Sequence, residues 1–203
     1  MIEAMMPLMI TSPHGGRIVN VSSRLGRVNG RRNVSSLYSF LLVHLDLLDM
    51  FELHIPQFFC FNVFVSLHCQ RIGDPSLRER LLNDDHLSEE LINEMVMKFL
   101  EQTKQDNWSS SNEWPQMYTD YSISKLAVNA YTRLLARRLL DRPEGQKIYI
   151  NCFCPGWVKT AMTGWEGNIS AEEGADTGVW LALVPQEQAT IGKFFAERRE
   201  ISF

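Results

Sequence analysis

The sequence has no long run of lysine or arginine, and its formal net charge is −4. A chain of this kind lacks the basic surface with which proteins bind nucleic acid or an anionic membrane. It has only 4 cysteines, and the pair Cys152 and Cys154 has neither a second pair nor a histidine cluster beside it. We therefore expect no metal site and interpret the cysteines as reduced thiols of a cytoplasmic protein.

Glycine, lysine and arginine are all absent from residues 34–70, a stretch crowded with phenylalanine and leucine. Its tract at residues 58–65 combines high β-propensity with little charge, which is typical of an aggregation-prone segment. Acidic residues, histidines and Pro56 interrupt the stretch before it reaches the ~20 apolar residues of a membrane-spanning helix. A membrane partner is therefore not expected, and a membrane-associated protein that uses residues 40–65 is kept as an alternative.

A glycine-rich Gly-x-x-x-Gly-x-Gly turn is also missing from the sequence. In dinucleotide-binding α/β domains, a glycine-rich turn follows the first strand and holds the pyrophosphate. The N-terminus lacks the basic region and apolar core of a signal peptide, and residues 1–10 are predicted to belong to an amphipathic helix. We expect that the chain starts partway along a helix of a larger domain.

The rest of the sequence alternates helical patterns with apolar strands. Strands are predicted at residues 17–23, 147–154 and 193–195, and helices at residues 88–104 (with Ser88 as the N-cap), 118–140 and 171–183. This alternation is typical of a parallel sheet with helices on its faces. The predicted fold class is therefore α/β, the C-terminal part of a doubly wound, Rossmann-like parallel sheet whose first strands are missing.

Tyr121 and Lys125 lie four residues apart in a predicted helix, so their side chains share one face. An ammonium group beside a phenol favours the phenolate, which makes tyrosine a usable general acid or base near neutral pH. A pair with this spacing is also common on ordinary exposed helices. Its interpretation therefore depends on the strand ends that accompany it.

Polar and turn-forming residues follow two of the predicted strands. The first strand ends in a Ser-Ser pair, and the hydroxyl of Ser23 can donate to a substrate carbonyl oxygen, because ligands bind at the carboxyl ends of such strands. Pro155 and Gly156 end the second strand, which leaves the Val158 amide and the Thr160 hydroxyl able to bind a planar amide such as a carboxamide. Either feature alone would be an ordinary turn.

In this order and spacing, the motifs resemble the short-chain dehydrogenase/reductase family. The second half of that family has a strand with Ser-Ser, then a Tyr-x-x-x-Lys helix, then a strand that ends in Pro-Gly before a threonine. The resemblance covers essentially all of the chain outside residues 34–70. Residues 23–27, 121–133 and 154–160 resemble the carbonyl reductase-like branch of plants, the salutaridine- and menthone-type reductases. Residues 71–114 resemble a helical insertion of that branch that tends to keep its members monomeric.

The resemblance implies a mechanism and a set of site residues. Ser23 would hold the substrate oxygen, Tyr121 would deliver or remove its proton, and Lys125 would support Tyr121 and bind the nicotinamide ribose. The cofactor-binding set would be Tyr121, Lys125, Pro155, Gly156, Val158 and Thr160, with the last two on the carboxamide.

The same resemblance implies the ligands. The cofactor would be NADP(H) rather than NAD, which follows from the branch alone because the selecting segment is missing. The substrate would be a small apolar ketone, aldehyde or alcohol, in a pocket lined from the loop near Arg24 and from residues 108–117 and 157–167. We expect a cytoplasmic monomer without nucleic-acid or membrane partners.

Residues 34–70 have no counterpart in the family, so the chain is expected to be one partial domain, residues 1–203, with an atypical insertion. Its removal would join Asn33 to Arg71 in a way that resembles the family. The stretch begins with Val-Ser-Ser and ends with Gln70, which can be encoded by the start and the end of an intron. We hypothesise a translated retained intron, and a genuine loop insertion is the alternative, although such a loop would risk an exposed apolar patch.

A sheet without its first strands exposes an edge, together with the apolar faces that the missing helices would cover. The leading hypothesis is therefore a reductase that is weakly active or inactive as this chain. The alternative is a non-catalytic interaction fragment that pairs with full-length paralogues through the exposed edge.

The first prediction concerns the purified chain. We expect it to fold poorly and to bind NADPH weakly or not at all, because about half a core must offset the conformational entropy of the ordered chain. Light scattering measures its association state, and quenching of protein fluorescence by NADPH measures binding. Soluble monomer with micromolar NADPH affinity would contradict this prediction.

Overall fold

The computed structural model describes residues 2–9, 15–29, 71–109, 113–116 and 118–203, so the insertion and the alternative membrane-associated stretch lie outside the described residues. Within these ranges four strands form one sheet in the order β1-β2-β3-β4. The strands are β1 (Gly16–Val21), β2 (Ile148–Phe153), β3 (Phe194–Ala196) and β4 (Arg199–Ile201). The first three run parallel and β4 runs antiparallel to β3, which confirms the predicted α/β class.

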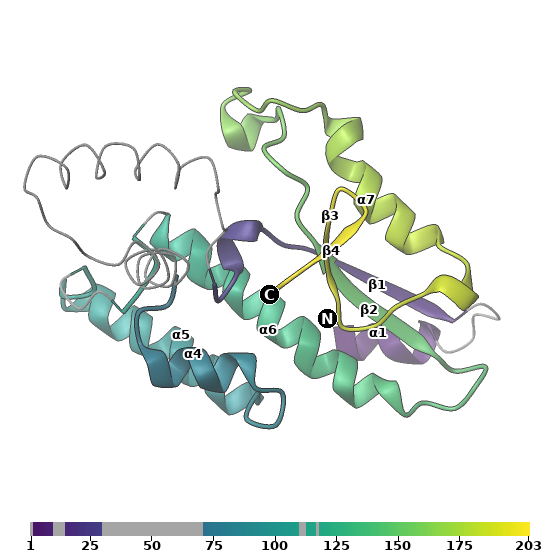
Figure 1. Cartoon of the computed structure of the whole chain (residues 1–203), viewed down its shortest axis with the longest axis horizontal. Coiled ribbons are helices and arrows are strands. Elements are labelled where there is room, and N and C mark those ends of the chain that lie inside the picture. Colours follow the sequence, from purple (N-terminus) through teal and green to yellow (C-terminus); the bar gives the residue numbers. More distant parts are fainter. Residues whose placement is uncertain (1, 10–14, 30–70, 110–112, 117) are drawn as a thin grey trace, which may run out of the picture.

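Helices alternate with these strands along the chain (Figure 1). The α-helices of the described ranges are α1 (Ile2–Met9), α4 (Pro75–Leu82), α5 (Glu89–Lys104), α6 (Thr119–Leu140) and α7 (Ala171–Leu183). Short 3₁₀ turns, η1 (Arg24–Gly26) and η2 (Ala161–Thr163), come after β1 and β2. The predicted elements are confirmed to within a few residues, and α4 and β4 are additional elements that the sequence patterns do not predict. None of these helices is long and apolar enough to cross a membrane.

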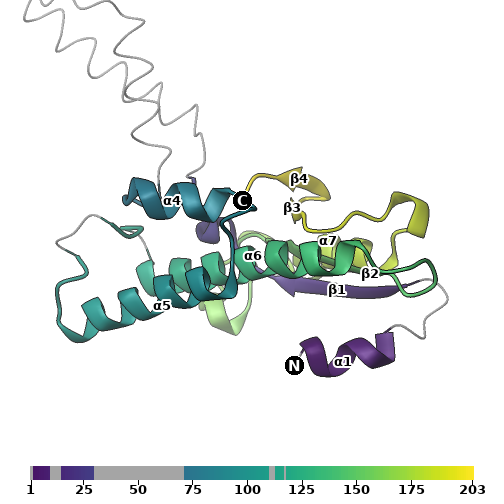
Figure 2. The ribbon, with the colours of Figure 1, turned by 90° about the horizontal axis from the view of Figure 1, so that it is seen from below.

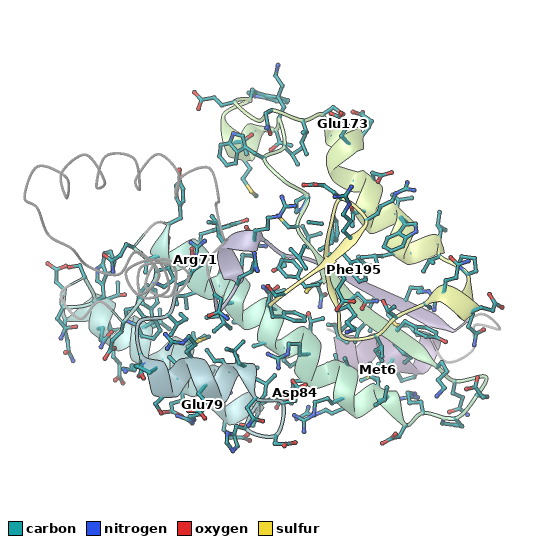
Figure 3. All side chains as sticks on the ribbon, in the orientation of Figure 1. Met6, Arg71, Glu79, Asp84, Glu173 and Phe195 are labelled. Atoms are coloured by element: carbon teal, nitrogen blue, oxygen red, sulfur yellow. The ribbon has the colours of Figure 1, made fainter. Side chains whose placement is uncertain are left out.

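Helices cover both faces of the sheet, because successive side chains of a strand point to opposite faces. On one face, Ile18 and Ile150 pack against α6 and against Met6 of α1. On the other face, Phe195 packs against Leu181 of α7. Met6 and Phe195 therefore mark opposite faces of the sheet (Figure 3).

A second core lies beside the sheet, where α4 and α5 pack against the first half of α6 (Figure 2). Leucine, isoleucine, methionine and phenylalanine build this core. They recur at helical spacing, so each of these helices has one apolar side. Its buried helical members are Leu77, Leu81, Leu91, Ile92, Met95, Phe99, Ile123, Leu126, Ala130 and Leu134. The long helix α6 therefore joins the helical core to the sheet.

Trp114 belongs to this helical core. Its side chain is only 1% exposed and meets Phe99 edge to face, with 5.5 Å between the ring centroids. Its indole Nε1 donates a hydrogen bond to Gln102 Oε1 at 2.5 Å, so the polar end of the ring is satisfied as well. The expectation that residues 108–117 line a substrate pocket is therefore wrong for Trp114.

Side-chain caps fix where α4, α5 and α7 begin. The Asp74 carboxylate accepts hydrogen bonds from two backbone N–H groups of the first turn of α4. The Ser88 hydroxyl accepts from the Leu91 N–H, so the predicted cap of α5 is confirmed. Ser170 and Glu173 form a capping box at the start of α7, where each side chain accepts from the other residue's N–H.

The hairpin of β3 and β4 turns through Glu197 and Arg198, which both have positive φ angles, 54° and 56°. Two-residue turns of this kind usually contain asparagine or glycine. The backbone strain at Glu197 and Arg198 must therefore be offset by a stabilising contact elsewhere. Arg198 supplies it through α7: its backbone N–H donates to Thr177 Oγ1 at 3.1 Å, and its guanidinium binds both oxygens of Asp176. The hydrogen bonds from the guanidinium hold the pKa of Asp176 below its ordinary value.

The second prediction concerns Cys152, whose pKa is raised to about 12 by burial in the core. At pH 8 about one thiol in ten thousand would be ionised, and the thiolate is the reactive form. We therefore expect iodoacetamide to leave Cys152 unmodified in the folded chain and to alkylate it readily in urea, as read by tandem mass spectrometry. Equal alkylation rates in both conditions would show that this strand is not buried as described.

Candidate functional site

The carboxyl ends of β1 and β2 lie side by side. The two strands are in register from Gly16 and Ile148 to Val21 and Phe153. One more backbone hydrogen bond, from the Ser22 N–H to the Phe153 carbonyl oxygen at 2.7 Å, extends the pairing past the strands. The residues that follow both strands therefore leave the sheet at one edge, which is where open α/β sheets bind their ligands.

Ser23 stands at the first of these strand ends and caps η1. Its Oγ accepts a hydrogen bond from the Leu25 N–H at 3.1 Å, and its carbonyl oxygen accepts from the Gly26 N–H at 2.9 Å. The residue is 9% exposed, so its side chain is held in place at the edge of the site. The tight turn is thus closed by Ser23 itself.

Gly26 lets η1 lie directly on α6. A Cβ at this position would come within 2.4 Å of the Lys125 carbonyl carbon and 2.6 Å of the Leu126 nitrogen. These are backbone atoms of a helix, so they cannot rotate aside as a side chain could. The absence of a side chain at Gly26 therefore sets the distance between the Ser23 turn and the helix that carries Lys125.

Tyr121 and Lys125 lie on consecutive turns of α6, as predicted. The Lys125 Nζ is 5.6 Å from the centroid of the Tyr121 ring. It also donates a hydrogen bond to the Val21 carbonyl oxygen at 3.1 Å, at the last residue of β1. The Tyr121 side chain is 39% exposed, so a ligand at the sheet edge can reach it. Lys125 therefore connects the helix to the strand end that carries Ser23.

The loop after β2 is folded back on itself. Gly156 adopts a positive φ of 90°, and Val158 forms an isolated parallel bridge with Ile169. The Thr163 Oγ accepts from the Thr160 N–H at 3.1 Å and donates to the Val158 carbonyl oxygen at 2.6 Å. Gly156, Val158 and Thr160 thus lie in one compact loop that starts, after Pro155, at the same sheet edge as Ser23.

Two features of the site region escaped the sequence analysis. Arg24 of η1 forms an ion pair with Glu197 of the β3–β4 turn, with 2.7 Å between Nη2 and Oε1. Asn129, one turn beyond Lys125, hydrogen-bonds to both Ser22 and Gly26 and is 1% exposed. The spacing of Tyr121, Lys125 and Asn129 at four-residue intervals is the one signal that could have drawn attention to the asparagine.

The residues present fit the nicotinamide half of a dinucleotide. The exposed Tyr121 ring, the Lys125 ammonium and the loop after Gly156 offer a phenol, a cation and backbone polar groups at one sheet edge. The described residues include no strand followed by a glycine-rich turn and a helix, which is what holds the pyrophosphate in such domains. The fit is therefore to one half of the cofactor.

Carbonyl reductases are among the relatives of this chain. It is 34% identical to carbonyl reductase (NADPH) 1 of Bos taurus over 158 residues, which is 76% of this chain and 56% of the relative. It is 34% identical to the Homo sapiens protein of the same name over 154 residues, 74% of this chain and 54% of that protein. No protein-family model matches the chain.

Two solved plant reductases share the fold. The structure of salutaridine reductase from Papaver somniferum superposes with a TM-score of 0.66 at 30% identity, over 95% of this chain and 49% of that one. Menthone neomenthol reductase from Mentha piperita gives a TM-score of 0.57 at 25% identity, over 96% of this chain and 45% of that one.

The chain is similar to the short-chain dehydrogenase/reductase family, as its relatives and the matching solved structures indicate. Within that family it is similar to the carbonyl reductases and to the salutaridine- and menthone-type reductases, which confirms the resemblance inferred from the motifs. It spans about half the length of the relatives and structures that it matches.

The third prediction concerns Gly26→Ala. The added methyl group would force η1 away from the backbone of α6, and we expect a loss of about 1–3 kcal/mol in the free energy of unfolding in urea. Arg137→Ala, at an exposed position of the same helix, serves as the control and should change the free energy by less than ~0.5 kcal/mol. A Gly26→Ala chain as stable as the parent would refute the close packing of η1 on α6.

Proposed function

We propose that this chain carries the catalytic half of an NADP(H)-dependent carbonyl reductase, which reduces a ketone or aldehyde to an alcohol or catalyses the reverse. The observation that carries the proposal is that Lys125, which lies beside Tyr121 on α6, donates to the last residue of β1, two residues before Ser23. The Lys125–Val21 hydrogen bond joins these two elements at the sheet edge. Similarity to the family supports assigning a chemical role to each of the three side chains.

In the proposed reaction, the protein transfers one proton and stabilises one developing negative charge. The Ser23 hydroxyl donates to the substrate oxygen and stabilises the charge on it. The Tyr121 hydroxyl transfers its proton to that oxygen in reduction and takes it back in oxidation. The Lys125 ammonium, fixed at the Val21 carbonyl, stabilises the phenolate that remains.

NADP(H) supplies the hydride when it is bound, and the protein supplies position and electrostatics. Lys125 would bind the nicotinamide ribose, while Val158 and Thr160 would bind the carboxamide beside Pro155 and Gly156. NADP(H) is preferred over NAD as the cofactor because the relatives are named for NADPH. A cytoplasmic location, inferred from the reduced cysteines, and a monomeric state, implied by the resemblance to the plant branch, complete the proposal.

The proposed substrate is apolar. Large hydrophobic side chains are exposed on the loop after β2: Trp157 is 51% exposed, Met162 is 90% exposed and Trp165 is 64% exposed. A group of large apolar side chains exposed to water is typical of a surface that binds an apolar ligand or partner, because exposing apolar area to water costs free energy. The Trp157 Nε1 donates to the Glu166 carbonyl oxygen at 3.0 Å, which holds that ring within the loop.

A second function is supported by the free edge of the sheet. Among the described residues β1 pairs with β2 alone, and Val21 at its end is 54% exposed. An unpaired strand edge can add a strand from another chain. The second candidate is therefore a non-catalytic interaction fragment that pairs with full-length paralogues through β1.

The fourth prediction tests the catalytic assignment. Tyr121→Phe, Lys125→Met and Ser23→Ala should each lower turnover of NADPH with an apolar ketone or aldehyde by at least ~100-fold, because each removes a group that acts on the reacting oxygen or its proton. Tyr118→Phe is the matched control, since Tyr118 is another exposed tyrosine at the start of the same helix. It should keep the parental rate, measured by the absorbance of the reduced nicotinamide.

Two results would reject the catalytic assignment. Undiminished turnover in Tyr121→Phe would show that the Tyr121 hydroxyl does not transfer the proton. Complete absence of turnover in the parent chain, together with co-purification with a full-length paralogue, would favour the interaction fragment. In that case, a Val21→Lys substitution should weaken the association, because it places a charge at the paired edge.

A further inference from the structure

We propose that Asn129 is a positioning residue, which holds the Ser23 turn in register with Tyr121 and Lys125 on α6. The inference rests on the proposed function, and it adds a residue that does not itself touch the reacting atoms. Asn129 lies one helical turn after Lys125 and is buried, with 1% of its surface exposed. Its side-chain amide points at the segment that carries Ser23.

Both ends of the Asn129 amide bind that segment. The Ser22 hydroxyl donates to Asn129 Oδ1 at 2.5 Å, and the Asn129 Nδ2 donates to the Gly26 carbonyl oxygen at 2.9 Å. The Cys152 thiol of β2 donates to the same Oδ1 at 3.4 Å. One side chain of α6 thus binds the residue before Ser23 and the last residue of η1, and it also meets β2.

The two hydrogen bonds bracket Ser23 in the sequence. Ser22 precedes it, and Gly26 closes the turn that Ser23 caps, with its own N–H bonded to the Ser23 carbonyl oxygen. The Ser22 Oγ also lies 3.4 Å from the Lys125 carbonyl oxygen, one turn earlier on the helix. Fixing both ends of a five-residue turn to α6 fixes the direction of the hydroxyl between them.

An amide is the group that this position requires. Oδ1 must accept a hydrogen bond while Nδ2 must donate one to a backbone carbonyl, and a buried partner left unsatisfied is costly. Leucine would satisfy neither side. Aspartate would accept from Ser22, but its second oxygen would face the Gly26 carbonyl and repel it unless that oxygen carries a proton.

An aspartate at position 129 therefore distinguishes the hydrogen-bonding role of the side chain from its role in filling space. Burial and the facing carbonyl favour the protonated carboxyl group, so its pKa should be raised toward neutrality. In Asn129→Asp the donor to Gly26 is then present at low pH and lost as the pH rises. The ratio of its kcat/KM to that of the parent at the same pH should increase by at least ~10-fold between about pH 8 and about pH 5.

The charged and titratable groups around Asn129 are common to both proteins, so the ratio cancels their titration. In the described part of the chain they include Cys152 on β2, which donates to Asn129 Oδ1, and Lys125 one turn earlier on α6, which donates to the Val21 carbonyl oxygen. The η1 turn that Asn129 binds adds Arg24, which pairs with Glu197. Burial raises the pKa of the Cys152 thiol to about 12, far from the pH range of the test.

Amide hydrogen exchange tests the same contact without any turnover. Asn129→Leu and Ser22→Ala should each speed the exchange of the Leu25 and Gly26 amides by at least ~10-fold, because their acceptors lie in the turn that Asn129 holds. The Ile150 amide, in the centre of β2, gives the reference rate for the folded chain.

Asn151→Asp is the matched control. Asn151 is also a buried asparagine, and it also donates to a backbone carbonyl, that of Thr190, while it accepts from the Lys193 N–H. It holds the loop before β3 instead of the Ser23 turn. Its aspartate variant should leave the exchange of Leu25 and Gly26 unchanged, and it should leave the pH dependence of kcat/KM parallel to that of the parent.

The outcomes separate this inference from the proposed reaction. Faster exchange at Leu25 and Gly26 in Asn129→Leu and Ser22→Ala supports it, even if the parent chain turns over no substrate and the catalytic proposal fails. Unchanged exchange in both variants overturns it, whatever the turnover. In an active parent, a rate ratio for Asn129→Asp that stays flat with pH, or that changes equally in Asn151→Asp, overturns it as well.

Discussion

Gly26 brings the backbone of η1 against the Lys125–Leu126 peptide of α6, closer than any side chain would allow. From this contact the arrangement of the site follows. The turn that starts at Ser23 cannot move away from the helix without losing the hydrogen bonds of Asn129 to Ser22 and Gly26. The strand end and the helix therefore act as one rigid support, which is what a reaction with a defined oxygen position demands.

Lys125 shows how one residue serves both packing and chemistry. Its ammonium is held by the Val21 carbonyl oxygen, which orients it toward the strand end, while it remains close to the Tyr121 ring. A cation held in this way needs no reorganisation when negative charge develops beside it. The same hydrogen bond that orders the end of β1 thus prepares the proposed proton transfer.

Much of the fold follows from local patterns. The cap at Ser88 and the run of apolar residues in β2 are local signals, and the structure confirms the elements that they predict. The strand β4 gave no such signal, because its turn uses Glu197 and Arg198 where a hairpin usually has glycine or asparagine. Its support comes from Asp176 and Thr177 on α7, which are distant in sequence and become neighbours only in the fold.

The sequence by itself determined the order of the strand ends and the spacing of Tyr121 and Lys125, because helical and strand periodicity are local properties of the chain. It also indicated the family that the chain resembles, because those motifs occur in one order. Tertiary structure decided that Trp114 fills a core and that Asn129 binds the Ser23 turn. The hydrogen bonds of Asn129 join segments about a hundred residues apart, and Trp114 meets Gln102 and Phe99 only because its loop folds back on α5. No local pattern specifies which of these residues will meet.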